Sequence, residues 1–150
     1  MTTYERILSE LGEGLGLDLA PDGSGVAEVC AEDRVVLLRA DETGERELTV
    51  FAVVSTAPEG GFPAVTLERA LSANLFGREV AGLHLGLFAD TLILSDSLPL
   101  ENLSAEALAE RIVMLARLAG KLSGMLASPA PAAAPDVGGG AFLGEGFIAM

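Results

Sequence analysis

The chain has 150 residues, half of them apolar, which is enough for one domain with a core of its own. Twenty-two acidic residues against nine basic ones give a net charge of −13. No cluster of Lys or Arg could follow a phosphate backbone, so nucleic acid is a poor candidate partner. The apolar runs are too short to span a bilayer and no secretory signal pattern is present, so we expect a cytoplasmic protein without membrane insertion.

The first expected element is a helix that begins near Thr2. Thr2 and Glu5 have the spacing of a capping box, in which each side chain bonds the other residue's backbone. The glycines at 12, 14 and 16 weaken the end of this helix, and LAPDGSG then turns the chain. Apolar residues recur along it at helical spacing: Tyr4, Ile7, Leu8, Leu11 and Leu15.

Three strands are expected next, as VAEVCAE, RVVLLRA and ELTVFAVVST, joined by short turns into an antiparallel meander. The second and third strands are apolar at both alternating sets of positions, so both faces of the sheet require cover. Three helices in a chain of this size can cover one face. The other face is then left for a second subunit or a bound ligand.

The remaining elements are a helix, a hairpin and a long helix. Thr66 is expected to cap the second helix, which ends at Gly77, and the hairpin turns at Ala89–Asp90. Ser104 caps the last helix, whose apolar stripe runs to Leu126. The predicted fold is α+β, a five-stranded antiparallel sheet with three helices in the order α-β-β-β-α-β-β-α.

Composition changes abruptly after Leu126, where ASPAPAAAPDVGGG holds three of the seven prolines and a triple glycine. We therefore expect a domain over residues 1–127 and a flexible Pro/Ala/Gly linker with a short apolar segment over 128–150. The segment AFLGEGFIAM, residues 141–150, either stays disordered or occupies a groove of its own or a neighbouring subunit.

No constellation for catalysis or metal binding emerges. GEGLGL follows a helix and puts Leu17 where a dinucleotide-binding loop needs its third glycine. Cys30 has no neighbouring ligand and is expected to be a small buried thiol. We expect no enzyme, no metal and no cofactor. The competing hypothesis is a small hydrolase that uses Glu32, Asp33 or His84, for which no second catalytic partner can be named.

Three stretches together resemble the type III secretion chaperones of the Tir-chaperone (CesT) family. LERALSANLFG is similar to that family's second helix with its Asn-Leu-Phe ending, and GLHLGLFADTLILSDSLPL to its fourth and fifth strands with their Leu-Pro-Leu exit. LSAEALAERIVMLARLAGKLSGML is similar to its closing helix, without the tryptophan often seen there. The resemblance covers about residues 3–127.

The resemblance implies a homodimer that binds the N-terminal region of a secreted effector and keeps it extended and secretion-competent, without ATP hydrolysis. The alternative is a YbjN-like α+β module that serves as a protein-binding regulator or adaptor. In the chaperone family the second helix and the strand after it build the subunit interface. The corresponding residues here are Leu71, Leu75, Phe76 and Leu85, of which Leu71 and Leu75 could instead be ordinary core.

Client binding requires a free strand edge and shallow apolar pockets, because an unfolded segment offers backbone groups and regularly spaced apolar side chains. A helix-side groove is expected from Ile7, Leu8, Leu11 and Leu15. A sheet-side patch is expected from Val36, Leu38, Phe51 and Val53. Core packing is the alternative for each of these residues, because the sequence does not say which of two apolar faces is inward.

Overall fold

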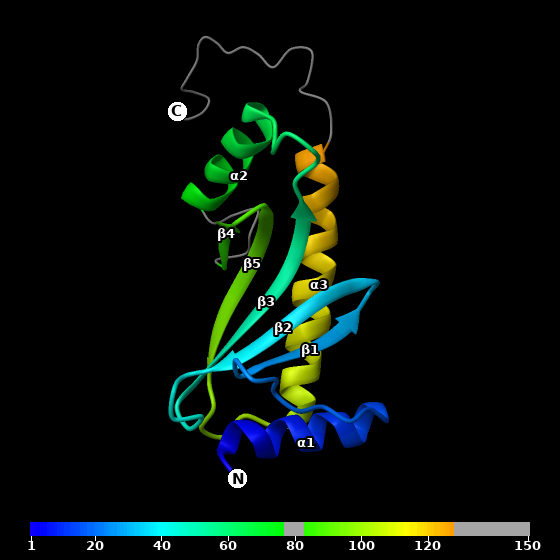
Figure 1. Ribbon diagram of the computed structural model, residues 1–150, viewed down its shortest axis with the longest axis vertical. Coiled ribbons are helices and arrows are strands. Elements are labelled where there is room, and N and C mark those ends of the chain that lie inside the picture. Colours follow the sequence, from blue (N-terminus) through cyan, green and yellow to red (C-terminus); the bar gives the residue numbers. More distant parts are fainter. Residues whose placement is uncertain (77–82, 128–150) are drawn as a thin grey trace.

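The computed structural model describes residues 1–76 and 83–127. Three helices and five strands follow one another in the predicted order, so the α+β prediction is confirmed (Figure 1). The elements are α1 (Thr3–Leu15), β1 (Val26–Ala31), β2 (Arg34–Ala40), β3 (Glu47–Thr56), α2 (Ala64–Phe76), β4 (His84–Phe88), β5 (Thr91–Pro99) and α3 (Ala105–Ala127).

The five strands form one antiparallel sheet in the order β1-β2-β3-β5-β4. Glu32 and Asp33 form the two-residue turn between β1 and β2, with φ of 52° and 62°. Positive φ at both positions gives a hairpin turn whose twist matches that of the strands. The β4–β5 hairpin turns at Ala89–Asp90 as predicted, with Ala89 at φ 54°.

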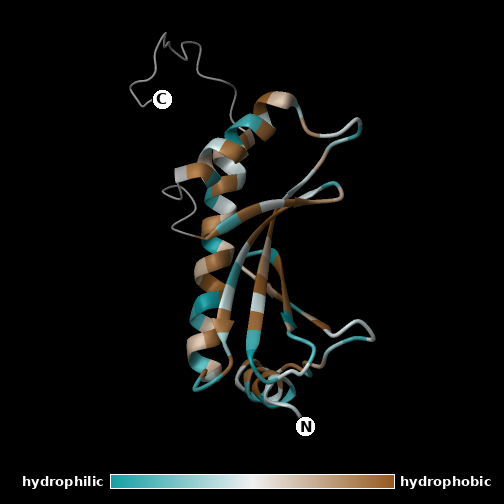
Figure 2. Ribbon diagram, turned by 90° about the vertical axis from the view of Figure 1, so that its left-hand side faces the viewer, coloured by the Kyte–Doolittle hydropathy of each residue, from teal (hydrophilic) through white to brown (hydrophobic). Residues whose placement is uncertain are grey.

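Helix α3 covers one face of the sheet, and α1 closes the lower end of the same core (Figures 1 and 2). Arg111 on α3 forms an ion pair with Asp96 on β5, which fixes the helix against this face. The buried residues contributed by the central strands are Val36, Leu38, Leu48, Val50, Ala52, Val54, Leu92 and Leu94, and those of α3 include Leu108, Leu115, Ala119 and Leu122.

Arg34 joins β2, a bulge in β3 and α3. The β3–β5 register shifts between Val53 and Ser55, and the Arg34 guanidinium donates to the carbonyl oxygens of Val53 at 3.0 Å and Val54 at 2.7 Å. Gly120 leaves room for that guanidinium, because a Cβ there would lie 3.3 Å from Arg34 Nε. The helix therefore approaches the sheet closely at this point.

The turn between β2 and β3 holds the beginning of α1. Thr2 caps the helix, because its hydroxyl accepts from the Glu5 N–H at 3.1 Å. The Gly44 carbonyl accepts from the Tyr4 N–H at 2.9 Å, and the Tyr4 hydroxyl donates to the Leu38 carbonyl at 2.8 Å. Burial raises the pKa of Tyr4 to about 12, so the phenol stays a neutral donor at physiological pH.

The glycines at the end of α1 complete the helix and turn the chain. Gly16 has φ 71°, a left-handed conformation that suits glycine, and the Leu17 N–H donates to the Gly12 carbonyl at 2.8 Å. The chain folds so tightly here that a Cβ on Gly12 would lie 2.6 Å from the Leu17 carbonyl oxygen. Gly14 faces open space.

Of the three predicted helix caps, Thr2 is described above, and the structure corrects one of the other two. Thr66 lies inside α2, which begins two residues earlier, and the Pro63 carbonyl accepts from the Thr66 N–H at 3.0 Å. The Pro63 carbonyl also accepts from the Leu67 N–H at 3.3 Å, so backbone bonds close the first turn of α2. Ser104 does cap α3, with its hydroxyl 3.0 Å from the Ala107 N–H.

We predict opposite effects of alanine at two neighbouring glycines of α1. Gly12→Ala should lower the free energy of unfolding by about 1–3 kcal/mol, because the added Cβ has no space against the Leu17 carbonyl. Gly14→Ala should raise it by about 0.5–1 kcal/mol, because alanine loses less backbone entropy in a helix. Urea unfolding of both full-length variants measures this, and equal effects would contradict the close approach at Gly12.

The Asp41 carboxylate organises the β2–β3 turn. It accepts from the hydroxyl and N–H of Thr43 and, at 3.0 Å each, from the N–H groups of Arg46 and Glu47. The Thr43 hydroxyl is the largest influence that holds the pKa of the Asp41 carboxyl well below its usual range, and these backbone donors add to it. The carboxylate therefore contributes stability above the pKa of the unfolded chain and loses that contribution as pH falls through the folded pKa.

We accordingly predict that the free energy of unfolding of Asp41→Asn depends less on pH than that of the unmodified chain. The difference in unfolding free energy between the unmodified chain and Asp41→Asn should be largest near neutral pH, and it should shrink as pH falls below about 4. Glu42→Gln, at the exposed neighbouring position, is the matched control and should run parallel to the unmodified chain. Denaturant unfolding between pH 3 and 7 measures both, and parallel curves for all three chains would refute the prediction.

Candidate protein-binding surfaces

The sheet has an apolar face opposite α3, which we call the open face. Its residues alternate with the buried ones: Leu37 pairs with Phe51, and Val53 with Ile93, while Val36 pairs with Ala52 in the core. Figure 2 shows α3 on one side of the sheet, and no described helix covers the other. The open face consists of Val35, Leu37, Phe51, Val53 and Ile93, all of which remain partly accessible or exposed.

Cys30 belongs to this open face, because it pairs with Val35 across β1 and β2. Its side chain is exposed, which contradicts the prediction of a buried thiol. The general tendency of free cysteine to be buried does not hold here because β1 is an edge strand whose outward positions no helix covers.

The two edges of the sheet differ. At the β4 edge, α2 packs against the strand, and the Asn74 side-chain oxygen accepts from the Leu85 N–H at 3.0 Å. A backbone donor of β4 is therefore already satisfied by the asparagine of ALSANLFG. At the β1 edge, no described residue pairs with the outer side of Ala27–Ala31. Unpaired backbone groups of this kind can accept an added strand.

A second apolar surface lies on the outer side of α2. Ala70 and Ala73 are buried and let the helix approach its neighbours, whereas Leu71 and Leu75 are 71% and 75% exposed. These two leucines, with Ser72 and Asn74, line a shallow hollow. Two large leucines so fully exposed one helical turn apart form a candidate contact surface.

The structure divides the residues that we predicted for client binding. Leu15 is 52% exposed at the end of α1, and Phe51 and Val53 lie on the open face. The remaining five are at most 2% exposed and pack in the core, which is the alternative that the sequence left open: Ile7, Leu8, Leu11, Val36 and Leu38.

The predicted sheet-side patch therefore combines two opposite faces, because Val36 and Leu38 point toward α3 while Phe51 and Val53 point away. Val35, Leu37 and Ile93, which the prediction missed, complete the open face. Polar residues at the same alternation, Glu28 and Thr49, marked this face as the outer one.

Among the predicted interface residues, Leu71 and Leu75 are exposed on α2, and Leu85 is buried at 6% exposure beneath that helix. Phe76 ends α2, and its side chain lies outside the described part of the chain. Because Leu85 is buried, it can affect a subunit contact only indirectly, by packing under α2 and holding β4 in place.

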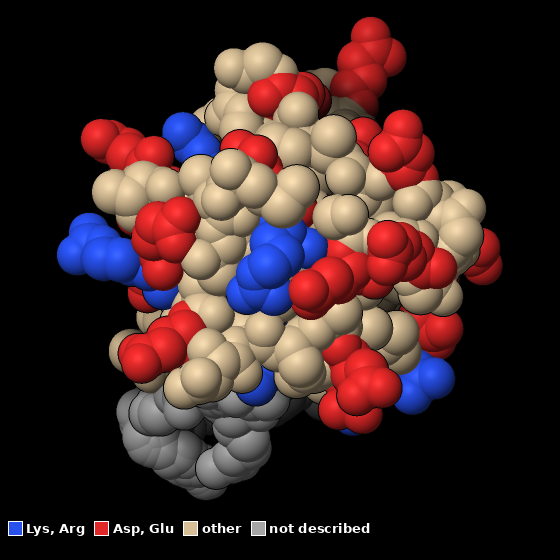
Figure 3. Space-filling view, turned by 90° about the horizontal axis from the view of Figure 1, so that it is seen from below, with Lys and Arg blue, Asp and Glu red and all other residues tan. Residues whose placement is uncertain are grey.

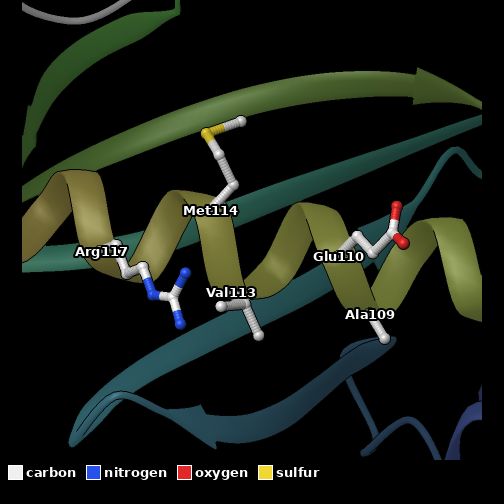
Figure 4. Close-up of a pocket in the computed structure, with 5 residues that line it drawn as sticks. All are labelled: Ala109, Glu110, Val113, Met114 and Arg117. Atoms are coloured by element: carbon white, nitrogen blue, oxygen red, sulfur yellow. The ribbon is translucent and has the colours of Figure 1, made fainter.

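The groups considered for hydrolysis do not come together. Glu32 forms an ion pair with Arg117 at 3.0 Å, in the turn beside β1, whereas His84 begins β4 at the opposite edge of the sheet. The hollow on the outer side of α3 is lined by Ala109, Glu110, Val113, Met114 and Arg117 and offers no nucleophile (Figure 4). Within residues 1–76 and 83–127, no cluster of His, Cys, Asp and Glu could hold a metal ion.

On the face seen from below, at the α1 end of the molecule, acidic side chains cover more of the surface than basic ones (Figure 3). Basic side chains are fewer and scattered among them, in keeping with the net charge of −13. Such a surface repels acidic partners and attracts basic ones, with a strength that salt reduces. None of the helices in the described part of the chain is long and apolar enough to cross a membrane.

Comparison with solved structures identifies similar folds. The chain is 24% identical to a chain of the Yersinia pestis type III secretion chaperone SycH in complex with a fragment of YscM2, with a TM-score of 0.58 and coverage of 79% and 98% of the two chains. It is 19% identical to a chain of the ExsC–ExsE complex, with a TM-score of 0.68 and coverage of 84% of this chain and 97% of the other. It is 21% identical to a chain of the HopA1–SchA chaperone–effector complex, with a TM-score of 0.59 and coverage of 81% of this chain and 91% of the other.

At these identities the structural likeness establishes the fold. No curated protein matches the chain. The model of the Tir chaperone protein (CesT) family matches residues 6–123, which is most of the sequence. The chain therefore belongs to the Tir chaperone protein (CesT) family.

Proposed function

We propose that this protein is a cytoplasmic chaperone that binds the N-terminal region of a type III secreted effector and holds it extended. Membership of the CesT family and the likeness to chaperones solved with their partners support a role in effector binding. The observation that carries the proposal is the open face of the sheet, which is apolar, uncovered in the described chain and adjacent to the free edge of β1.

An extended polypeptide suits this surface for two physical reasons. The β1 edge can form hydrogen bonds with the backbone donors and acceptors of the client. An unfolded client can therefore lose its bound water without leaving these backbone groups unpaired. The open face can bury apolar client side chains, each worth about 1.5–3 kcal/mol when fully buried. Both contributions come from burial and hydrogen bonding, so the proposed function requires no ATP hydrolysis.

The predicted client residues take different parts in this proposal. Phe51 and Val53 contact the client on the open face, and Leu15 extends an apolar surface at the end of α1. The buried residues shape these surfaces from beneath by packing the core against which α1 and the sheet are held: Ile7, Leu8, Leu11, Val36 and Leu38.

We further propose that the protein acts as a homodimer through the outer side of α2. Leu71 and Leu75 supply the exposed apolar contact, Phe76 follows them at the end of the helix, and Leu85 fixes β4 under α2. Burial of Leu71 and Leu75 against a second copy removes the most exposed leucines among the described residues from water. A stable dimer should bury more than about 1,000 Å² in total.

The client prediction is tested with the affinity-tagged full chain in the bacterium that encodes it. We expect copurification of a secreted protein, in which limited proteolysis shows a protected N-terminal stretch of tens of residues. Phe51→Glu should weaken binding of that client at least tenfold, about 1.4 kcal/mol, because a carboxylate replaces an apolar contact.

Val113→Glu introduces the same charge at a partly exposed apolar position on α3 and should leave client affinity unchanged. Circular dichroism checks that both variants fold. Recovery of a folded partner without a protected stretch, or equal weakening by both variants, would count against the open face as the client surface.

The dimer prediction uses exposed positions so that the fold of each chain is retained. Leu71→Glu combined with Leu75→Glu should convert the protein from dimer to monomer in sedimentation equilibrium at micromolar concentration, because two charges would have to be buried in the contact. Leu17→Glu, at a residue 52% exposed near the end of α1, is the matched control and should stay dimeric. An unmodified chain that sediments as a monomer at these concentrations would overturn the proposal.

A further inference from the structure

We propose that residues 141–150 dock onto the open face of the chain that carries them. This docking is independent of any client, and its consequence, that a client must displace the segment, rests on the proposed function. The proposal follows from the chemistry of the face, the chemistry of the segment and the length of chain that separates them.

The face requires an apolar cover. Its five apolar residues lie in adjacent rows across β2, β3 and β5, and Phe88, 74% exposed at the end of β4, stands near the same side of the sheet. Contiguous apolar surface is unusual on a lone soluble protein, and it marks a binding site when it persists. The adjacent β1 edge adds backbone hydrogen-bonding groups, so an extended segment fits better than a helix.

The segment AFLGEGFIAM has the composition that this face requires. Its apolar side chains include Phe142, Leu143, Phe147 and Ile148, and Glu145 is its only charged side chain. A segment with so little charge can approach a chain of net charge −13 without the repulsion that a more acidic segment would meet. Its apolar side chains also supply the contacts that a client would make.

The connection is long enough. Helix α3 ends at Ala127 beside the upper end of the sheet and close to α2 (Figure 1). The 14 residues from 128 to 141 can span up to about 46 Å when extended. The 23 residues of α3, which run along the sheet, measure only about 35 Å. The tether starts on the α3 side of the sheet and must pass round an edge, but Arg117 on α3 pairs with Glu32 in the β1–β2 turn, so the nearby part of the open face around Val35 is within reach.

A tether of this length gives the segment an effective concentration of millimolar order. Even a weak contact is then well populated, and docking in about 90% of molecules would reduce the apparent affinity for a competing client about tenfold. A chaperone with a covered face exposes less apolar surface before it meets its client, which limits aggregation.

The test uses Cys30, the only cysteine of the chain, which lies on the open face beside Val35. A nitroxide spin label on Cys30 of the full chain should strongly weaken the NMR signals of residues 141–150, relative to the reduced label. The signals should recover in the double variant Phe142→Asp with Phe147→Asp, whose segment no longer suits an apolar face. Intact signals in the unmodified segment would overturn the proposal.

The matched control is Ala133→Asp with Val137→Asp, which adds the same two charges between α3 and the segment and should keep the signals weakened. Equal recovery in both double variants would show that charge, and not the apolar segment, governs the effect. Isotope-labelled Cys30→Ser chains mixed with spin-labelled unenriched chains should keep their signals, because docking occurs within one chain. Loss of signal in that mixture would assign the contact to a second copy and refute the proposal.

A second measurement avoids the label. The reaction rate of Cys30 with a thiol reagent should rise about tenfold in the Phe142→Asp, Phe147→Asp chain if docking covers the face in about 90% of molecules. An unchanged reaction rate, together with NMR signals that the spin label does not weaken, would show that the segment does not dock. Neither measurement involves a client, so failure here leaves the proposed chaperone function standing, and failure of client binding leaves the docking result standing.

Discussion

The structure depends on the fact that a single long helix covers a single face of the sheet. Five strands spaced about 4.8 Å apart make a sheet roughly 20–24 Å wide, and a helix with its side chains is only about 10 Å across. Helix α3 therefore fills the space over the central strands, with α1 closing one end. No described helix remains for the other face. The apolar residues of β2, β3 and β5 that point away from α3 are left as a surface, and that surface makes the chain suited to bind another polypeptide.

The two edges of the sheet also differ in whether a helix covers them. Helix α2 lies against β4, and Asn74 satisfies a backbone donor of that strand. This contact covers part of the β4 edge, and Leu71 and Leu75 lie exposed on the other side of the helix. The β1 edge has no such cover among the described residues. The different environments of the two edges separate the surface that we propose for a second subunit from the one that we propose for an extended client.

Helix α1 lies at the end of the core because backbone contacts hold it there at both ends. Its first turn is bound to the β2–β3 turn that Asp41 organises, and its last turn folds back onto Gly12. Both contacts require glycine, because neither Gly12 nor Gly44 has room for a side chain. Tyr4, with its hydroxyl bonded to the Leu38 carbonyl, ties the same helix to the sheet. The position of Leu15 at the margin of the molecule follows from these constraints.

The sequence by itself determined the element order, the antiparallel sheet, the cap at Ser104 and the family, because periodicity, turn residues and local motifs are properties of short stretches. It also showed that the sheet is apolar on both faces. Tertiary structure decided which face is covered: Val36 and Leu38 are core while Leu37 and Phe51 are surface, a choice that depends on where α3 packs. It also placed Cys30 at an exposed edge and gave Asn74 its partner in β4. Alternation along a strand gives two sets of residues, and only contact with another element distinguishes inside from outside.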